Sequence, residues 1–205
     1  RRFIMSFIEI ITYIGIFAFA IAGALKARGA NLDIFGGVVV AFVASYGGGT
    51  IRDLLLGIHP VNWINDNLAL GLVFAGTIAT FLLKDRLNHF RRTIFFTDAI
   101  GLGMFTAVGI EVASQTGAND LYSLVMGVIT ATFGGLIADI FCGYTPALLK
   151  KGELYATACA IGGLLFIFIN NFLFFARDVD LAICVILVVA IRIYSKRKRL
   201  MLPNI

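Results

Sequence analysis

Seven long apolar runs, separated by short polar breaks, constrain this chain more than any other feature of its sequence. They cover about 7–25, 34–56, 67–83, 94–113, 120–142, 153–173 and 178–195. A helix needs about 20 apolar residues to cross the hydrocarbon core of a membrane, and the runs come close to that length. They lack the strict alternation of apolar and polar residues that barrel strands show. The runs therefore predict membrane-spanning helices.

The composition agrees with this interpretation. Hydrophobic residues make up 60% of the chain and charged residues 14%, whereas a soluble domain carries roughly 25% charged residues. The connections are too short for a separate soluble domain, and six further runs follow the first, so we do not expect the first to be a cleaved signal peptide. We predict an all-α integral membrane protein with seven transmembrane helices in a single membrane domain over residues 1–205.

Lysine and arginine lie unequally at the two ends of the predicted helices. When the connections alternate between two sides, one side receives Lys26, Arg28, Lys84, Arg86, Arg91, Arg92, Lys150, Lys151, Arg192, Lys196, Arg197, Lys198 and Arg199. The other side receives Arg1, Arg2 and Arg177. Cytoplasmic loops carry the excess of these residues. We therefore expect the C-terminus in the cytoplasm and the N-terminus outside.

A glycine-rich motif occurs twice. The stretches GGGTIRDLLLGIHP (Gly47–Pro60) and GGLIADIFCGYTP (Gly134–Pro146) align without gaps at an offset of 86 residues. The offset extends into the flanking runs, which predicts two repeats of three helices, at about 7–83 and 94–173, and an extra helix at about 178–195. Because three is odd, the second repeat enters the membrane upside down. Such an inverted 3+3 repeat is typical of transporters and channels.

The glycines themselves allow two interpretations. Each glycine costs about 1 kcal/mol relative to alanine inside a helix, so Gly47, Gly48 and Gly49, and then Gly134 and Gly135, weaken the second and fifth helices. Kinks there would free backbone carbonyls, which hydrocarbon tolerates only where protein or water satisfies them. Two facing kinks would imply a hydrated path suited to a partly dehydrated monovalent cation. The alternative is close helix packing, which small residues permit.

Polar residues flank the glycines. Tyr46, Thr50, Thr130 and Thr132 could line the path, or the threonines could bond back to their own helices. Asp53 and Asp139 each follow the last glycine of the run, Gly49 or Gly135, by about one helical turn, and they should lie toward opposite ends of the path. Carboxylates inside a membrane are costly and often functional, although both could simply reach the interface.

Four other side chains carry specific expectations. Neighbouring residues on a helix point in different directions, so Arg52 is expected to pair with another helix or to extend toward the interface. It could gate or seal a cation path. Asp98 is expected near a helix N-terminus. Glu9 and Glu111 are expected at the interface.

Other classes of protein lack support in the sequence. Cys142, Cys159 and Cys184 lie in apolar runs and are expected to be buried. His59 and His89 are isolated, so we expect no metal site beyond transient monovalent cations, and no cofactor. No nucleophile and base form a recognisable pair, so the chain is not expected to be an enzyme. The positive charge follows membrane topology, which argues against nucleic acid as a partner.

The motifs GGGTIRD and GGLIAD, the seven helices and the 3+3+1 inverted repeat resemble the prokaryotic members of the TRIC family, the trimeric intracellular cation channels. The resemblance covers nearly the whole chain. It implies a homotrimer in a prokaryotic plasma membrane, surrounded by membrane lipids. It also implies a separate pore in each protomer, lined by kinked helices two and five, that conducts potassium and sodium ions.

The chain also departs from that pattern. It lacks the Lys-Glu-Val lipid-binding motif of eukaryotic members, and its second motif has two glycines instead of three. Some bacterial relatives are described as transporters of small amino acids, glycine in particular. The alternative is therefore a secondary transporter, in which Arg52 with Asp53 or Asp139 binds a zwitterion.

Overall fold

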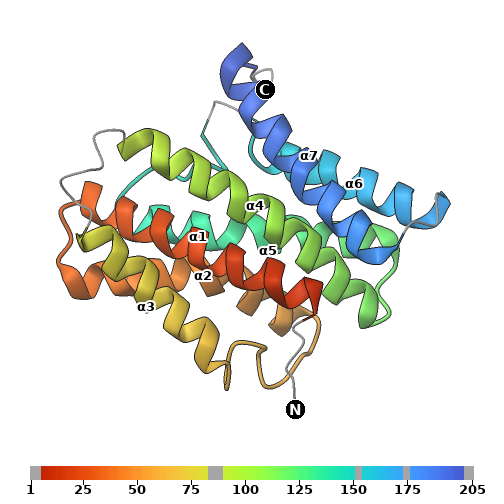
Figure 1. The fold of residues 1–205 in the computed structure, drawn as a ribbon, viewed down its shortest axis with the longest axis horizontal. Coiled ribbons are helices and arrows are strands. Elements are labelled where there is room, and N and C mark those ends of the chain that lie inside the picture. Colours follow the sequence, from red (N-terminus) through yellow and green to blue (C-terminus); the bar gives the residue numbers. More distant parts are fainter. Residues whose placement is uncertain (1–5, 83–89, 151–153, 173–175, 201–205) are drawn as a thin grey trace.

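The chain folds into a bundle of helices. The computed structural model describes residues 6–82, 90–150, 154–172 and 176–200, and these ranges contain seven helices and no strand (Figure 1). The helices are α1 (Phe7–Gly29), α2 (Ile34–Leu55), α3 (Asn67–Leu82), α4 (Phe90–Gln115), α5 (Asp120–Phe141), α6 (Ala156–Phe172) and α7 (Arg177–Lys198). Each predicted run forms one helix, so the all-helical prediction is confirmed. Arg1, Arg2, Lys84, Arg86, His89 and Lys151 lie outside the described residues.

Several helices extend beyond their apolar runs. Helix α1 continues through Lys26 and Arg28 to Gly29, and Asn31, two residues further on, has a φ of 57°. Cations in a last turn face the negative end of the helix dipole, which favours this extension. Helix α4 begins at Phe90, so Asp98 lies two turns inside it. The expectation that Asp98 sits near a helix N-terminus is wrong.

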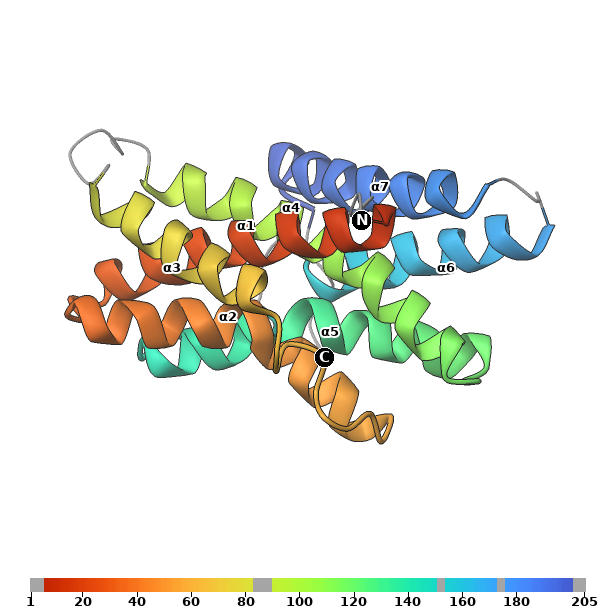
Figure 2. The same ribbon diagram turned by 60° about the horizontal axis from the view of Figure 1, so that its bottom comes forward.

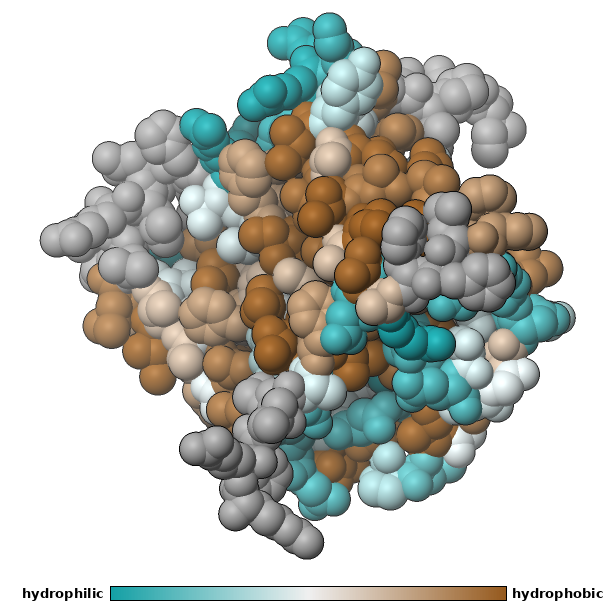
Figure 3. All heavy atoms as spheres, turned by 45° about the vertical axis from the view of Figure 1, so that its right-hand side comes forward, coloured by the Kyte–Doolittle hydropathy of each residue, from teal (hydrophilic) through white to brown (hydrophobic). Residues whose placement is uncertain are grey.

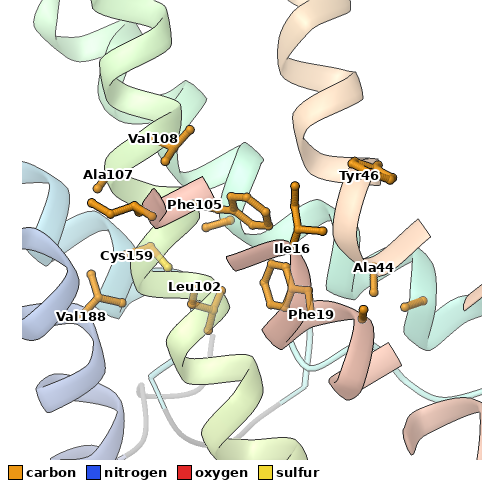
Figure 4. Packing of buried hydrophobic residues seen from close by; sticks show 14 of the residues in the cluster. Ile16, Phe19, Ala44, Tyr46, Leu102, Phe105, Ala107, Val108, Cys159 and Val188 are labelled. Atoms are coloured by element: carbon orange, nitrogen blue, oxygen red, sulfur yellow. The ribbon is translucent and has the colours of Figure 1, made fainter. Parts of the chain in front are cut away.

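The helices pack in two similar groups. Helix α1 packs against α2 and α3, and α4 packs against α5 and α6, while α7 lies on α4 and α6. The groups meet where α1 contacts α4 and where α2 crosses α5 in the opposite direction (Figure 2). Figure 4 shows the rings of Phe19 and Phe105 meeting at the centre of this contact, with centroids 5.2 Å apart. These two residues correspond to each other at the offset of 86.

Close contacts between helices recur at the same offset. A Cβ atom added to Gly48 of α2 would collide with the carbonyl oxygen of Thr130 in α5. One added to Gly134 would collide with the carbonyl oxygen of Ala44, and each pair is the other pair shifted by 86 residues. Exchanged contacts of this kind are what a two-fold axis produces. They support the predicted inverted repeat.

The outside of the bundle is largely apolar. Figure 3 shows a belt of hydrophobic side chains, with hydrophilic ones at the top and lower right. Exposed large apolar side chains include Phe35, Leu55, Leu82, Leu121, Phe172 and Ile186. Patches of this extent mark contact with lipid or with other protein. Helices α1, α2, α4 and α5 are long and apolar enough to cross a membrane, and α3 and α6 are apolar but shorter.

Candidate functional site

The glycines mark the crossing of α2 and α5. The backbone stays helical through both runs of glycines, and Gly47 lies so near α5 that an added Cβ would be 3.4 Å from the Cα of Gly134. The structure therefore shows close packing at Gly47, Gly48 and Gly134. Gly49 and Gly135 face other neighbours. A Cβ added to Gly49 would lie 3.7 Å from Arg52 Nη2, whereas a Cβ added to Gly135 would lie 2.7 Å from the Tyr155 hydroxyl.

Asp53 ties the end of α2 to the loop that follows it. Its Oδ2 accepts a hydrogen bond from the backbone N–H of Asn62 at 2.8 Å. Its Oδ1 accepts from Nε and Nη2 of Arg52, at 2.9 and 2.7 Å. Both residues are buried, with 5% of Arg52 and 1% of Asp53 exposed. The expectation that Arg52 pairs with another helix or extends to the interface is wrong, because its long side chain folds back to the adjacent carboxylate.

Asp139 plays the same part at the end of α5. Its Oδ2 accepts from the backbone N–H of Ala147 at 2.9 Å, and its Oδ1 lies 2.8 Å from Nζ of Lys26 in α1. The helix ends match as well, because Gly57 and Gly143 both have a φ of 70°. This left-handed conformation is the usual glycine stop of a helix. The carboxylates thus close two similar loops. The C-terminal ends of α2 and α5, where these loops begin, lie at opposite ends of the crossed helices (Figure 2).

A pocket of about 360 Å³ opens at the Asp53 end. Its charged lining residues are Glu9, Arg52, Asp53 and Asp66, so carboxylates outnumber the single guanidinium. Its other lining residues are Ile8, Thr12, Tyr13, Ile16, Ser45, Tyr46, Gly49, Asn62, Trp63, Ala69, Phe105, Val108, Val112, Gln115 and Thr130. The pocket therefore extends from the loop after α2 to Thr130, beside the glycine crossing.

The predicted polar residues divide between the pocket and the helices. Thr50, Thr130 and Thr132 each donate to the carbonyl four residues earlier, at 2.8, 2.6 and 2.7 Å, as the back-bonding alternative predicted. Of the three, Thr130 also lines the pocket. Tyr46 lines it too, and its ring stacks on Trp63 with centroids 5.3 Å apart. Trp63, in turn, donates to the hydroxyl of Thr50 at 2.9 Å.

A cluster of buried charges fills the Asp139 end. We call it the closed cluster; its members are Lys26, Asp98, Asp139, Tyr155 and Arg192. Besides the Lys26–Asp139 pair, the Tyr155 hydroxyl donates to Oδ1 of Asp98 at 3.2 Å. Nη2 of Arg192 lies 3.6 Å from Oδ2 of the same carboxylate. All five residues are at most 9% exposed, so the cluster blocks the space beside Gly135.

The two ends differ because corresponding residues differ. At the offset of 86, Lys26, Asp98 and Tyr155 correspond to Val112, Thr12 and Ala69, and these three line the open pocket. At the Asp53 end, these small or apolar side chains occupy the positions that an ammonium group, a carboxylate and a tyrosine ring occupy at the Asp139 end. The open pocket and the closed cluster are therefore the same region of the two repeats, empty in one and filled in the other.

The sequence patterns indicate only part of the closed cluster. Lys26 and Arg192 contribute to the charge bias between the two sides, and no motif includes Tyr155. A comparison of the repeats for positions where only one copy is charged would have found Lys26 and Asp98. Glu111, expected at the interface, is 3% exposed and pairs with Arg177 at 2.6 Å. The three cysteines are buried, as predicted.

A family model described as Glycine transporter matches the chain twice, over residues 9–85 and 95–171. The chain belongs to this family. The two matches are offset by 86 residues, the same offset that relates the two glycine motifs, and each match contains one motif.

Curated relatives are described as membrane proteins. A UPF0126 membrane protein of Vibrio cholerae is 40% identical over 160 residues, which cover 78% of this chain and 66% of that protein. The UPF0126 inner membrane protein YadS of Escherichia coli strain K12 is 37% identical over 152 residues, covering 74% and 73%. With its apolar helices, the chain is accordingly a membrane protein.

Solved structures share its fold. The TRIC trimeric intracellular cation channel orthologue from Rhodobacter sphaeroides is 32% identical with a TM-score of 0.89, covering 96% of this chain and all of that one. A prokaryotic TRIC channel in 0.5 M KCl is 33% identical with a TM-score of 0.86, covering 93% and 96%. The predicted resemblance to prokaryotic TRIC proteins is confirmed.

Proposed function

We propose that the chain is a monovalent cation channel, with a pathway for potassium and sodium ions between α2 and α5 of each protomer. The observation that carries the proposal is the pocket, because three carboxylates and one guanidinium line it and it reaches the glycine crossing. An excess of carboxylates around a low-dielectric recess concentrates cations there. The TRIC channels that share the fold support the same function.

The proposal places the pore along Gly47, Gly48, Gly49, Gly134 and Gly135. The pocket forms its outer part and the closed cluster its cytoplasmic gate. Tyr46 and Thr130 line the open part. Thr50, Thr132 and the glycines of the crossing support its walls. Opening then requires Tyr155 and the Lys26–Asp139 pair to move away from Gly135.

The difference between the two ends favours a channel over a carrier. A carrier must close each end in turn around its substrate, and inverted repeats usually exchange equivalent conformations. Here Val112, Thr12 and Ala69 cannot form the ion pair and the tyrosine contact that close the other end. One gate suffices for a channel.

The assembly and orientation belong to the same proposal. We propose a homotrimer in a prokaryotic plasma membrane, with lipids around the apolar belt, the N-terminus outside and the C-terminus cytoplasmic. The trimeric structures of the same fold and the charge bias support it.

A small-amino-acid carrier remains the second candidate function, and the description of the family favours it. Arg52 and the carboxylates of the pocket offer both partners that a zwitterion such as glycine needs.

Recording from purified protein in planar bilayers under a KCl gradient separates the two functions. We expect discrete unitary currents with a reversal potential set by the cation gradient. Concentrative uptake of labelled glycine into proteoliposomes, without unitary currents, would establish the carrier instead.

A further inference from the structure

Helix α7 has no counterpart in the repeats, yet it supplies one member of the closed cluster. The guanidinium of Arg192 enters between two rings, with Cζ 4.9 Å from the centroid of Phe95 and 5.0 Å from that of Tyr155. Nη1 donates to the carbonyl oxygen of Leu154 at 3.0 Å, and Nη2 faces Asp98. The side chain is 6% exposed. A planar guanidinium can stack and donate at once, which a lysine cannot do.

A second contact from α7 holds the same segment. The hydroxyl of Ser195, one turn further along, accepts from the backbone N–H of Leu154 at 3.0 Å. Arg192 and Ser195 thus hold both backbone polar groups of Leu154, the residue directly before Tyr155. These contacts help to fix the position of Tyr155, the residue that covers Gly135. That position therefore depends on α7 as well as on the repeats.

We propose that α7 is the locking element of the cytoplasmic gate, and that Arg192 is the positioning residue that holds Tyr155 and Asp98 over Gly135. The inference rests on the proposed channel function and extends it to the regulation of the gate. It also gives a role to α7, the helix that has no counterpart in the repeats. The repeats already differ at Lys26, Asp98 and Tyr155, and α7 adds the arginine that holds Asp98 and Tyr155 in place.

The test compares Arg192→Gln with Arg197→Gln. Arg197 lies on the same helix with an exposed side chain, so its substitution removes the same charge outside the cluster. Both substitutions are made in protein whose Cys159 and Cys184 are replaced by alanine, which leaves Cys142 as the only thiol. Cys142 is 8% exposed and lies within electrostatic reach of Lys26 and Asp139.

The first measurement is the rate at which a charged methanethiosulfonate reagent modifies Cys142 in nanodiscs. We expect Arg192→Gln to raise this rate several-fold and Arg197→Gln to leave it at the parent value. The second measurement is the open probability in bilayers, which should rise with the same pattern. Modification at the parent rate in folded Arg192→Gln protein would overturn the proposal.

Two further variants keep the test decisive if Arg192→Gln alone does not fold. The double variant Asp98→Asn/Arg192→Gln removes both charges together, so neither is left buried and unpaired. Tyr155→Phe deletes one hydroxyl and keeps the ring. Both should speed modification of Cys142, and parent rates in both would contradict the proposal. The modification rate of Cys142 can be measured without any current. If the parent protein conducts no ions, the proposed channel function is rejected, and the role of α7 can still be tested by the modification rates.

Discussion

The ammonium group of Lys26 lies 2.8 Å from the carboxylate of Asp139, and this buried pair joins the end of α1 to the end of α5. The corresponding carboxylate, Asp53, has no such partner, because Val112 stands at the position equivalent to Lys26. Asp53 is paired instead with its own neighbour Arg52. The two corresponding carboxylates both close a loop, but Asp139 forms its ion pair with another helix and Asp53 forms its ion pair within its own helix.

The loss of one partner of the Lys26–Asp139 pair should lower the thermal stability of the protein more than the loss of both. Removing one partner of a buried ion pair costs about 3–5 kcal/mol, because an uncompensated charge stays behind. We expect Lys26→Met to lower the thermal midpoint of the protein in detergent by much more than the double change Lys26→Met/Asp139→Asn. Equal midpoints for the two variants would show that the pair carries no buried charge.

The crossing of α2 and α5 should tolerate no side chain at two of its glycines. Gly48→Ala and Gly134→Ala each place a methyl group against a backbone carbonyl that cannot turn away. Overpacking costs about 1–3 kcal/mol or more, so we expect poor assembly in size-exclusion chromatography. Gly37→Ala is the matched control, since nothing lies within 4 Å of its added Cβ. Normal assembly of both crossing variants would contradict the close contact.

The carboxylates of the pocket should raise the local cation concentration. We expect Glu9→Gln and Asp66→Asn to reduce current carried by cations that enter from the Asp53 end. The reduction should be strongest at low salt, because the Debye length is about 8 Å at physiological ionic strength and longer in dilute buffer. Asp178→Asn serves as the control, since Asp178 is exposed and does not line the pocket. An equal loss of current in the control variant would show that the carboxylates of the pocket do not act on the ion pathway.

Asp53 and Asp139 should act on opposite directions of current. We expect Asp53→Asn to reduce current that enters at its own end and Asp139→Asn to reduce current from the other end. The two variants would then rectify in opposite senses, as bilayer recordings with equal salt on both sides can show. Loss of the same size in both directions would place the two carboxylates in one binding site and favour the carrier.

The proposed orientation can be checked with single cysteines at exposed positions. Leu32→Cys and Lys198→Cys should react with an impermeant thiol reagent from the cytoplasm, and Asp178→Cys should react from outside. All three side chains are exposed, and the native cysteines are buried. Reaction of Leu32→Cys and Lys198→Cys from different sides would contradict the seven-helix topology.

The sequence by itself determined the number of helices in the described residues and the correspondence of the two halves at an offset of 86 residues. Apolar runs of membrane-spanning length leave the backbone little choice but helix, because hydrocarbon offers no other hydrogen-bond partners. The motifs at Gly47–Pro60 and Gly134–Pro146 likewise determined where α2 and α5 end, since glycine at 57 and 143 stops each helix locally. These features depend on residues that are close together in the chain.

Only the tertiary structure decided which charges meet. The pairing of Lys26 with Asp139, and of Arg192 with Asp98, joins residues from different helices, and no local pattern records which faces will touch. The same holds for Arg52, because no local pattern records that its side chain folds back onto Asp53. The open pocket and the closed cluster arise from similar motifs, so their difference depends on packing partners such as Ala69, Tyr155 and the extra helix α7.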